Sequence, residues 1–120
     1  MIEQLISRVF YARNAAHFEH WRATGTGSFA KHMALGTFYE DVIEAIDAVV
    51  EAHQGVFDLI GNIPSPQIAS GDILKVLEDD AAWIQQHHED ICGGNYGIGN
   101  LLDTVSNTYQ SAIYKLRNLK

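Results

Sequence analysis

Apolar residues recur at three- and four-residue steps in four stretches of the chain, the spacing that places them on one side of an α-helix. This pattern predicts helices over residues 2–23, 29–54, 71–92 and 97–119. The core positions it indicates are Ile2, Leu5, Ile6, Val9, Phe10, Ala16, Phe18, Phe29, Met33, Phe38, Val42, Ile46, Val49, Val50, Ile73, Leu74, Leu77, Ala81, Ile84, Ile91, Ile98, Leu101, Leu102, Val105, Tyr109, Ile113 and Leu116. We therefore expect an all-α fold in a single domain, residues 1–120.

Turn-forming residues separate these stretches and suggest where each helix ends. Ser28 follows a Gly- and Thr-rich turn and can cap the second helix through its hydroxyl oxygen. Gly55 suits the position just after that helix. Ser70 or Asp72 can cap the third helix, and the run 93–95 (Gly-Gly-Asn) ends it.

The connection over residues 55–69 is the long one. Pro64 and Pro66 forbid a continuous helix there, although one short helical turn is compatible with the sequence. Its apolar residues predict that it packs on the body of the protein: Val56, Phe57, Leu59, Ile60, Ile63 and Ile68. Two short connections and one long middle connection predict the up-down-down-up order of a ferritin-like four-helix bundle. An up-down bundle is the alternative if the long connection folds back.

Composition narrows the class of protein. Apolar residues form 47% of the 120 residues, charged residues form 19%, and the formal net charge is −7. An acidic surface repels phosphate backbones, so nucleic-acid binding is not expected. No apolar run of about 18 residues and no signal peptide are visible, so no membrane span is expected. The single cysteine, Cys92, excludes an internal disulfide and fits a reducing, cytoplasmic setting.

Polar residues at helical spacing mark the second predicted helix as a candidate metal-binding element. Its stripe consists of His32, Gly36, Glu40, Ile43, Asp47 and Glu51. On this helix alone, a solvated face is an equally good interpretation. The first predicted helix adds His17 and His20, one turn apart, and the short connection brings them near His32. Imidazole and carboxylate ligands together suit iron, zinc or manganese.

Helical rise limits how these residues can meet. His32 and Glu51 lie about 28 Å apart along one helix, so they cannot share a metal ion within one chain. If the second helix lies antiparallel to the same helix of another chain, His20 and His32 face Asp47 and Glu51 of the partner subunit. A twofold homodimer would then hold two such metal sites.

The same residues resemble the motif of the DNA-protecting mini-ferritins, the Dps family. That motif has a His-Trp pair, a Gly five residues after the His, a second His after twelve, and an Asp and a Glu after twenty-seven and thirty-one. This chain matches it, with an aromatic where one is frequent, at His20, Trp21, Gly25, His32, Tyr39, Asp47 and Glu51. The resemblance covers about residues 2–55. It implies a dimer-shared site for two irons, Fe(II) oxidation, usually with hydrogen peroxide, and a shell of twelve subunits that stores ferric mineral.

Two departures from the motif bear on activity. The family carries an acid four residues after the second His, where this chain has Gly36. Glu40, His17 or water could fill that place. Otherwise the site would hold one metal, with weak or altered ferroxidase activity. The lysine-rich N-terminal tail of the family is missing, so DNA binding does not carry over.

Other clusters receive simpler interpretations. His87, His88 and Glu89 are read as a surface cluster, His53 as a complement to the helix dipole, and Trp21 as a core residue. A di-iron site within one bundle fails, because the fourth predicted helix has neither His nor Glu. Two functions remain open. One is a Dps-like iron-binding ferroxidase, and the other is a non-catalytic ferritin-like structural or adaptor protein.

Overall fold

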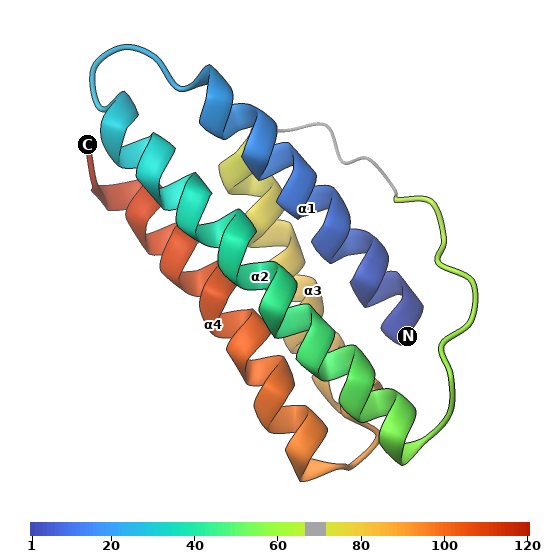
Figure 1. The fold of residues 1–120 in the computed structure, drawn as a ribbon. Helices are drawn as coiled ribbons and strands as arrows, with labels where there is room; N and C mark the ends of the chain where they lie inside the picture. The colour runs from blue at the N-terminus through green and yellow to red at the C-terminus, as the bar shows by residue number, and fades with distance from the viewer. Residues whose placement is uncertain (67–71) are drawn as a thin grey trace.

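The computed structural model describes residues 1–66 and 72–120. These residues form four helices and no strand (Figure 1): α1 (Ile2–Arg22), α2 (Ser28–Val56), α3 (Ile73–Cys92) and α4 (Tyr96–Asn118). The prediction of an all-α four-helix bundle is therefore confirmed. The helix bounds agree with the sequence pattern to within about two residues. Residues 67–71, which include the predicted cap Ser70 and the predicted contact Ile68, lie outside the described part.

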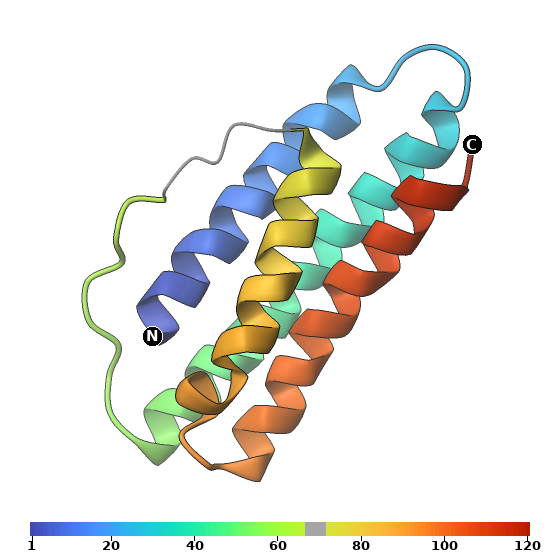
Figure 2. The same cartoon turned by 180° about the vertical axis from the view of Figure 1, so that it is seen from behind.

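Each helix packs against two others. α1 lies beside α2 and α3, and α4 lies beside α2 and α3. In both views the chain runs in one direction along α1 and α4 and in the opposite direction along α2 and α3 (Figures 1 and 2). Residues 57–66 run beside α1 in both views, and the Gly61 N–H donates a hydrogen bond of 2.8 Å to the Glu3 carboxylate. The body measures 47 × 26 × 21 Å.

All four helices contribute to one apolar core. Its largest fully buried side chains are Tyr109, Phe38, Leu5, Leu35, Ile46, Leu77, Ile84, Ile98, Leu102, Val9, Val42 and Val49. Leu35 is the member of this set that the sequence pattern did not single out. Burial of such side chains stabilises a fold by roughly 1.5–3 kcal/mol each. The three- and four-residue spacing thus identified most of the core correctly.

Five aromatic or methionine positions predicted in the core are instead exposed: Phe10, Phe18, Trp21, Phe29 and Met33. Phe29 is the extreme case, with 75% of its surface accessible. Each helix packs against only two neighbours. When the apolar side of a helix is wider than the area these neighbours cover, the apolar residues at its edges remain on the outer surface. Large apolar side chains therefore remain exposed to solvent on both α1 and α2.

The capping prediction holds for α3 and fails for α2. The Asp72 carboxylate accepts a 2.9 Å hydrogen bond from the Lys75 N–H, as a helix N-cap does. In contrast, Ser28 is already the first helical residue of α2. The N-cap is Gly27, which has a left-handed φ of +80° and supplies no side-chain cap.

The end of α2 also differs from expectation. Gly55 was predicted to follow the helix, but α2 continues through Val56 and ends where the Phe57 N–H donates to the His53 carbonyl. At the end of α3, Gly93 adopts a left-handed φ of +58°, as predicted for a terminating glycine. A side chain at position 93 would also collide with the Phe57 ring at 2.7 Å.

The prediction that the long connection packs down on the body is wrong for most of its residues. Leu59 and Ile63 are exposed, as are Val56 and Phe57 at the end of α2. Ile60 alone of the described apolar residues in this segment packs against the core. Residues 57–66 contain no helical turn. An extended, proline-containing segment on a helix surface presents one side to solvent, so its apolar residues cannot all be covered.

A buried polar network crosses the bundle. Arg8 of α1 donates a 2.9 Å hydrogen bond to one oxygen of Asp80 on α3, and the Tyr109 hydroxyl on α4 donates a 2.8 Å bond to the other. Burial raises the pKa of Asp80 above its usual value. Burial and the Asp80 carboxylate raise the pKa of Tyr109 well above its usual value. Because each partner comes from a different helix, the network fixes how α1, α3 and α4 sit against one another.

Candidate metal centre

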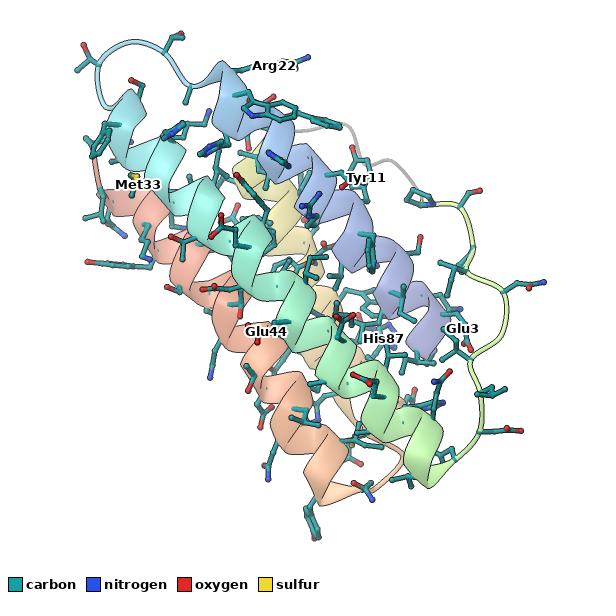
Figure 3. The ribbon with its side chains drawn as sticks, viewed as in Figure 1. Glu3, Tyr11, Arg22, Met33, Glu44 and His87 are labelled. Carbon is teal, nitrogen blue, oxygen red and sulfur yellow. The ribbon has the colours of Figure 1, made fainter. Side chains whose placement is uncertain are left out.

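His20 near the end of α1 and His32 near the start of α2 are brought side by side. Their rings stack with centroids 3.6 Å apart and planes inclined by 20°. The Nδ1 atom of His20 lies 2.6 Å from the His32 carbonyl oxygen, and the Nδ1 atom of His32 lies 3.0 Å from the His20 carbonyl oxygen. In Figure 3 this end of the bundle is the one that carries the labels Arg22 and Met33.

This reciprocal bonding fixes the tautomer of both rings. A carbonyl oxygen can only accept a hydrogen bond, so each Nδ1 must carry the proton. In the neutral ring the lone pair is then on Nε2, which can bind a metal ion. Donation of the other ring N–H to a carbonyl is the usual way in which metal-binding histidines are oriented. In this tautomer both rings carry their lone pair on Nε2.

Gly36 explains how the ring of His20 can approach α2 so closely. A Cβ atom at position 36 would lie 3.2 Å from Cε1 of His20 and 3.3 Å from its Nδ1. These distances are shorter than ordinary van der Waals contact, so a larger residue would press on the ring. In the Dps motif, position 36 matters only as the place of an acidic ligand, which Gly36 lacks. In the structure, Gly36 has a packing role.

Aromatic rings surround the histidine pair. Tyr39 stacks on His17 with centroids 4.0 Å apart and meets His20 edge-on at 5.3 Å. Burial and the nearby Arg13 and His20 lower the pKa of His17. Trp21 was expected in the core, yet 66% of its surface is exposed and its ring lies 4.3 Å from His17.

Asp47 and Glu51 lie one turn apart on α2, and both are exposed. They border a groove of about 400 Å³ between α1, α2 and the following segment, lined by Ile6, Phe10, Ile46, Asp47, Val50, Glu51 and Ile60. Helical rise places this carboxylate pair about 22 Å along α2 from the level of the His20–His32 pair. One chain therefore brings the histidines together and the carboxylates together, but keeps the two pairs apart.

No group of three or more His, Cys, Asp or Glu residues within residues 1–66 and 72–120 converges closely enough to hold a metal ion. Neither Glu40 nor His17 completes a metal-binding group with the histidine pair inside one chain.

A second histidine cluster lies on α3. The Nε2 atom of His88 is 2.8 Å from an oxygen of Asp103 on α4. His87, labelled in Figure 3, packs against the Trp83 ring at 4.6 Å. Asp103 was not identified from the sequence as a partner, because the pairing depends on the register between two helices. With 60% of its side chain exposed, Asp103 places this pair at the surface, as the sequence interpretation of this cluster expected.

The described part of the chain contains no helix that is both long and apolar enough to cross a membrane. No curated protein and no solved structure matches the chain. The sequence profile of DUF5856, described as a family of unknown function, matches residues 20–116, a range that begins at His20 and includes His32, Asp47 and Glu51. Since the matched range covers most of the 120 residues, the chain belongs to the DUF5856 family.

Proposed function

We propose that this protein is a ferritin-like, Dps-type iron-binding protein with a ferroxidase site shared between two subunits. The observation that carries the proposal is the reciprocal bonding of His20 and His32. It leaves one Nε2 lone pair free on each ring. Two histidines oriented in this way would supply one nitrogen ligand to each of two irons.

The ferritin-like part of the proposal rests on helix order. α2 and α3 run in the same direction and are joined by the long connection, while the α1–α2 and α3–α4 connections are short. In a ferritin-like bundle the long connection crosses the length of the body between its second and third helices. The pattern of exposed apolar residues on α1 and α2 also fits a protein that associates through this pair of helices.

The shared site requires an antiparallel pairing of two α2 helices about a twofold axis. The His20–His32 pair of one subunit would then face Asp47 and Glu51 of the partner subunit. The carboxylates are exposed and edge a groove, so they are free to meet such a partner. The proposed assembly is a homodimer, and a twelve-subunit shell would be built from such dimers.

The chemistry follows from the ligand types. Neutral imidazole nitrogens bind Fe(II), and carboxylate oxygens stabilise the more highly charged Fe(III) that forms. Each Fe(II) gives up one electron, so two Fe(II) ions reduce one hydrogen peroxide, with two protons, to two water molecules. The irons are the substrate. The chain's own residues would bind them through the imidazoles of His20 and His32 of one subunit and the carboxylates of Asp47 and Glu51 of the other. A reducing cytoplasm, where Fe(II) persists, is the compartment that this function requires.

Iron binding and Fe(II) oxidation test the proposal directly. Metal content would be measured after equilibration with Fe(II) without oxygen, and oxidation would be followed by absorbance after peroxide is added. We expect His20→Ala and Asp47→Ala each to abolish most of the iron binding. His88→Ala, which removes a histidine from the surface pair on α3, is the matched control and should leave it unchanged. Iron binding that is unaffected by His20→Ala and Asp47→Ala would refute the proposal.

A non-catalytic role is the second candidate, and one observation favours it. His32 donates to the His20 carbonyl near the end of α1, where backbone carbonyls lack helical partners. The histidine pair could therefore serve only to close the α1–α2 hairpin, with Gly36 making room for it. In that case the wild-type protein would bind no iron, while His32→Ala would still lower its stability.

A further inference from the structure

We propose that Arg13 and Glu40 form an ion pair across the twofold axis of the homodimer and set its register. This inference rests on the antiparallel α2 pairing of the proposed function. It adds a pair of positioning residues that hold the two halves of the metal site opposite each other. The occupant of the α1–α2 face is thus a second copy of this chain.

The charge of α2 is the first part of the argument. Its exposed carboxylates are Glu40, Asp41, Glu44, Asp47 and Glu51. Two such helices placed antiparallel would repel each other, and the net charge of −7 on each chain adds to this. A metal ion can neutralise Asp47 and Glu51. The carboxylates near the middle of α2 need a cation from the protein itself.

Arg13 is the arginine of α1 that is available for this role. Arg8 is bound to Asp80, and Arg22 is bound to Glu19. Arg13 forms no ion pair with any residue of the described part of the chain. Its Nη1 donates to the neutral Asn14 carboxamide at 3.1 Å. Its Nε is buried, with no acceptor among the residues that the structure describes.

Arg13 also lies at the right position along the bundle axis to be near the twofold axis. The twofold axis must pass midway between the His32–Gly36 level and the Asp47–Glu51 level of α2, which is near residue 41 or 42. Glu40 is then about 2 Å from the axis along the helix. α1 runs antiparallel to α2, so Arg13, seven residues before His20, lies about 10 Å further from the histidine pair. That places it at the same level, near the axis.

The local packing agrees with this position. The Arg13 guanidinium lies over the Tyr39 ring, 5.4 Å from its centroid, and Tyr39 is the residue before Glu40 on α2. The Arg13 side chain therefore already packs against α2, the helix that would contact the second subunit. Twofold symmetry would place Arg13 of each subunit near Glu40 of the other and create two equivalent ion pairs.

Charge reversal in the metal-free protein tests the proposal, with association measured by sedimentation in the presence of a chelator. Arg13→Glu and Glu40→Arg should each weaken homodimer formation by about tenfold or more, because like charges then meet at the axis. An equimolar mixture of these two variants should form heterodimers, since every pair in the heterodimer has opposite charges. The double variant R13E/E40R should dimerise like the wild type.

Lys115→Glu and Glu89→Arg are the matched controls, because they make the same charge changes on α4 and α3. Both should leave dimerisation unchanged. Circular dichroism of each variant separates loss of folding from loss of association. Single variants that dimerise normally would overturn the proposal, and so would a mixture that forms no heterodimer. A wild-type dimer that binds iron but shows no charge-reversal effect refutes the ion pair alone. A dimer with heterodimer rescue and no iron binding refutes the proposed function alone.

Discussion

His20 and His32 each donate a hydrogen bond from Nδ1 to the other's backbone carbonyl, at 2.6 and 3.0 Å. Each residue thus orients its partner while its own carbonyl is satisfied. The arrangement closes the short connection between α1 and α2 and uses Nδ1 of each ring, so that in the neutral ring the lone pair is on Nε2. The reciprocal hydrogen bonds between His20 and His32 can therefore serve both the stability of the α1–α2 hairpin and metal binding. Experiments can separate these two roles.

Gly36→Ala should destabilise the protein even though alanine is the better helix former. Alanine gains about 1 kcal/mol in helix propensity over glycine. Its methyl group would however press on the His20 ring at 3.2 Å, and that ring is held by its bond to His32. We expect overpacking to cost about 1–3 kcal/mol and to outweigh the gain. Urea unfolding measures the net change.

Gly55→Ala provides the matched control for this experiment. Gly55 is also within α2, but its added methyl group would meet nothing within 4 Å. This variant should be more stable than the wild type by roughly 0.5–1 kcal/mol. If both substitutions stabilise equally, Gly36 has no special packing role.

Mixing two inactive variants should restore iron oxidation. H20A/H32A lacks the imidazoles and D47A/E51A lacks the carboxylates, so neither homodimer has a complete site. In a mixed dimer one site lacks all four ligands and the other is intact. We expect up to about one quarter of wild-type activity after subunit exchange, because half of the dimers are mixed and each has one site of two. Absence of any recovery, with exchange verified by mass spectrometry, would argue against a shared site.

Tyr109→Phe should destabilise the core. The substitution removes the hydroxyl that donates to Asp80 and leaves a buried carboxylate oxygen without that donor. The expected cost is about 1–3 kcal/mol in the free energy of unfolding, measured with urea. Tyr114→Phe on the same helix is the control, because Tyr114 is exposed and should change stability by less than about 0.5 kcal/mol.

The effect of Tyr109→Phe should also depend on pH. Burial raises the pKa of Asp80 in the folded state, so the folded protein holds this proton more tightly than the unfolded chain does. The protonated Asp80 side chain adds to the free energy of unfolding below the ordinary pKa of an aspartate. This contribution is lost as pH rises through the raised pKa of Asp80 in the folded protein. Without the Tyr109 hydroxyl, which lowers this pKa, the loss should be larger. The stability difference between wild type and variant should therefore be constant at low pH and grow as pH rises through the raised pKa of Asp80 in the folded wild type. A constant difference would contradict this.

The helices and most of the core could be predicted because both depend on local periodicity. The His20–His32 contact could also be anticipated, since a short connection brings those helix ends together. The Arg8–Asp80–Tyr109 network could not, because it joins three helices whose register is set only by packing. The exposure of Phe29 was missed for a related reason: periodicity identifies an apolar stripe but not how much of it the neighbouring helices cover.

The contacts of α1 have a consequence for movement. Glu3 holds Gly61 at one end, Arg8 holds Asp80 one turn and a half further on, and His20 holds His32 at the other end. To slide past its neighbours by a single turn, about 5.4 Å, α1 would have to break all three attachments at once. The position of α1 along the bundle axis is therefore fixed relative to the other helices. A molecule that binds the surface of α1 meets that surface at one constant position.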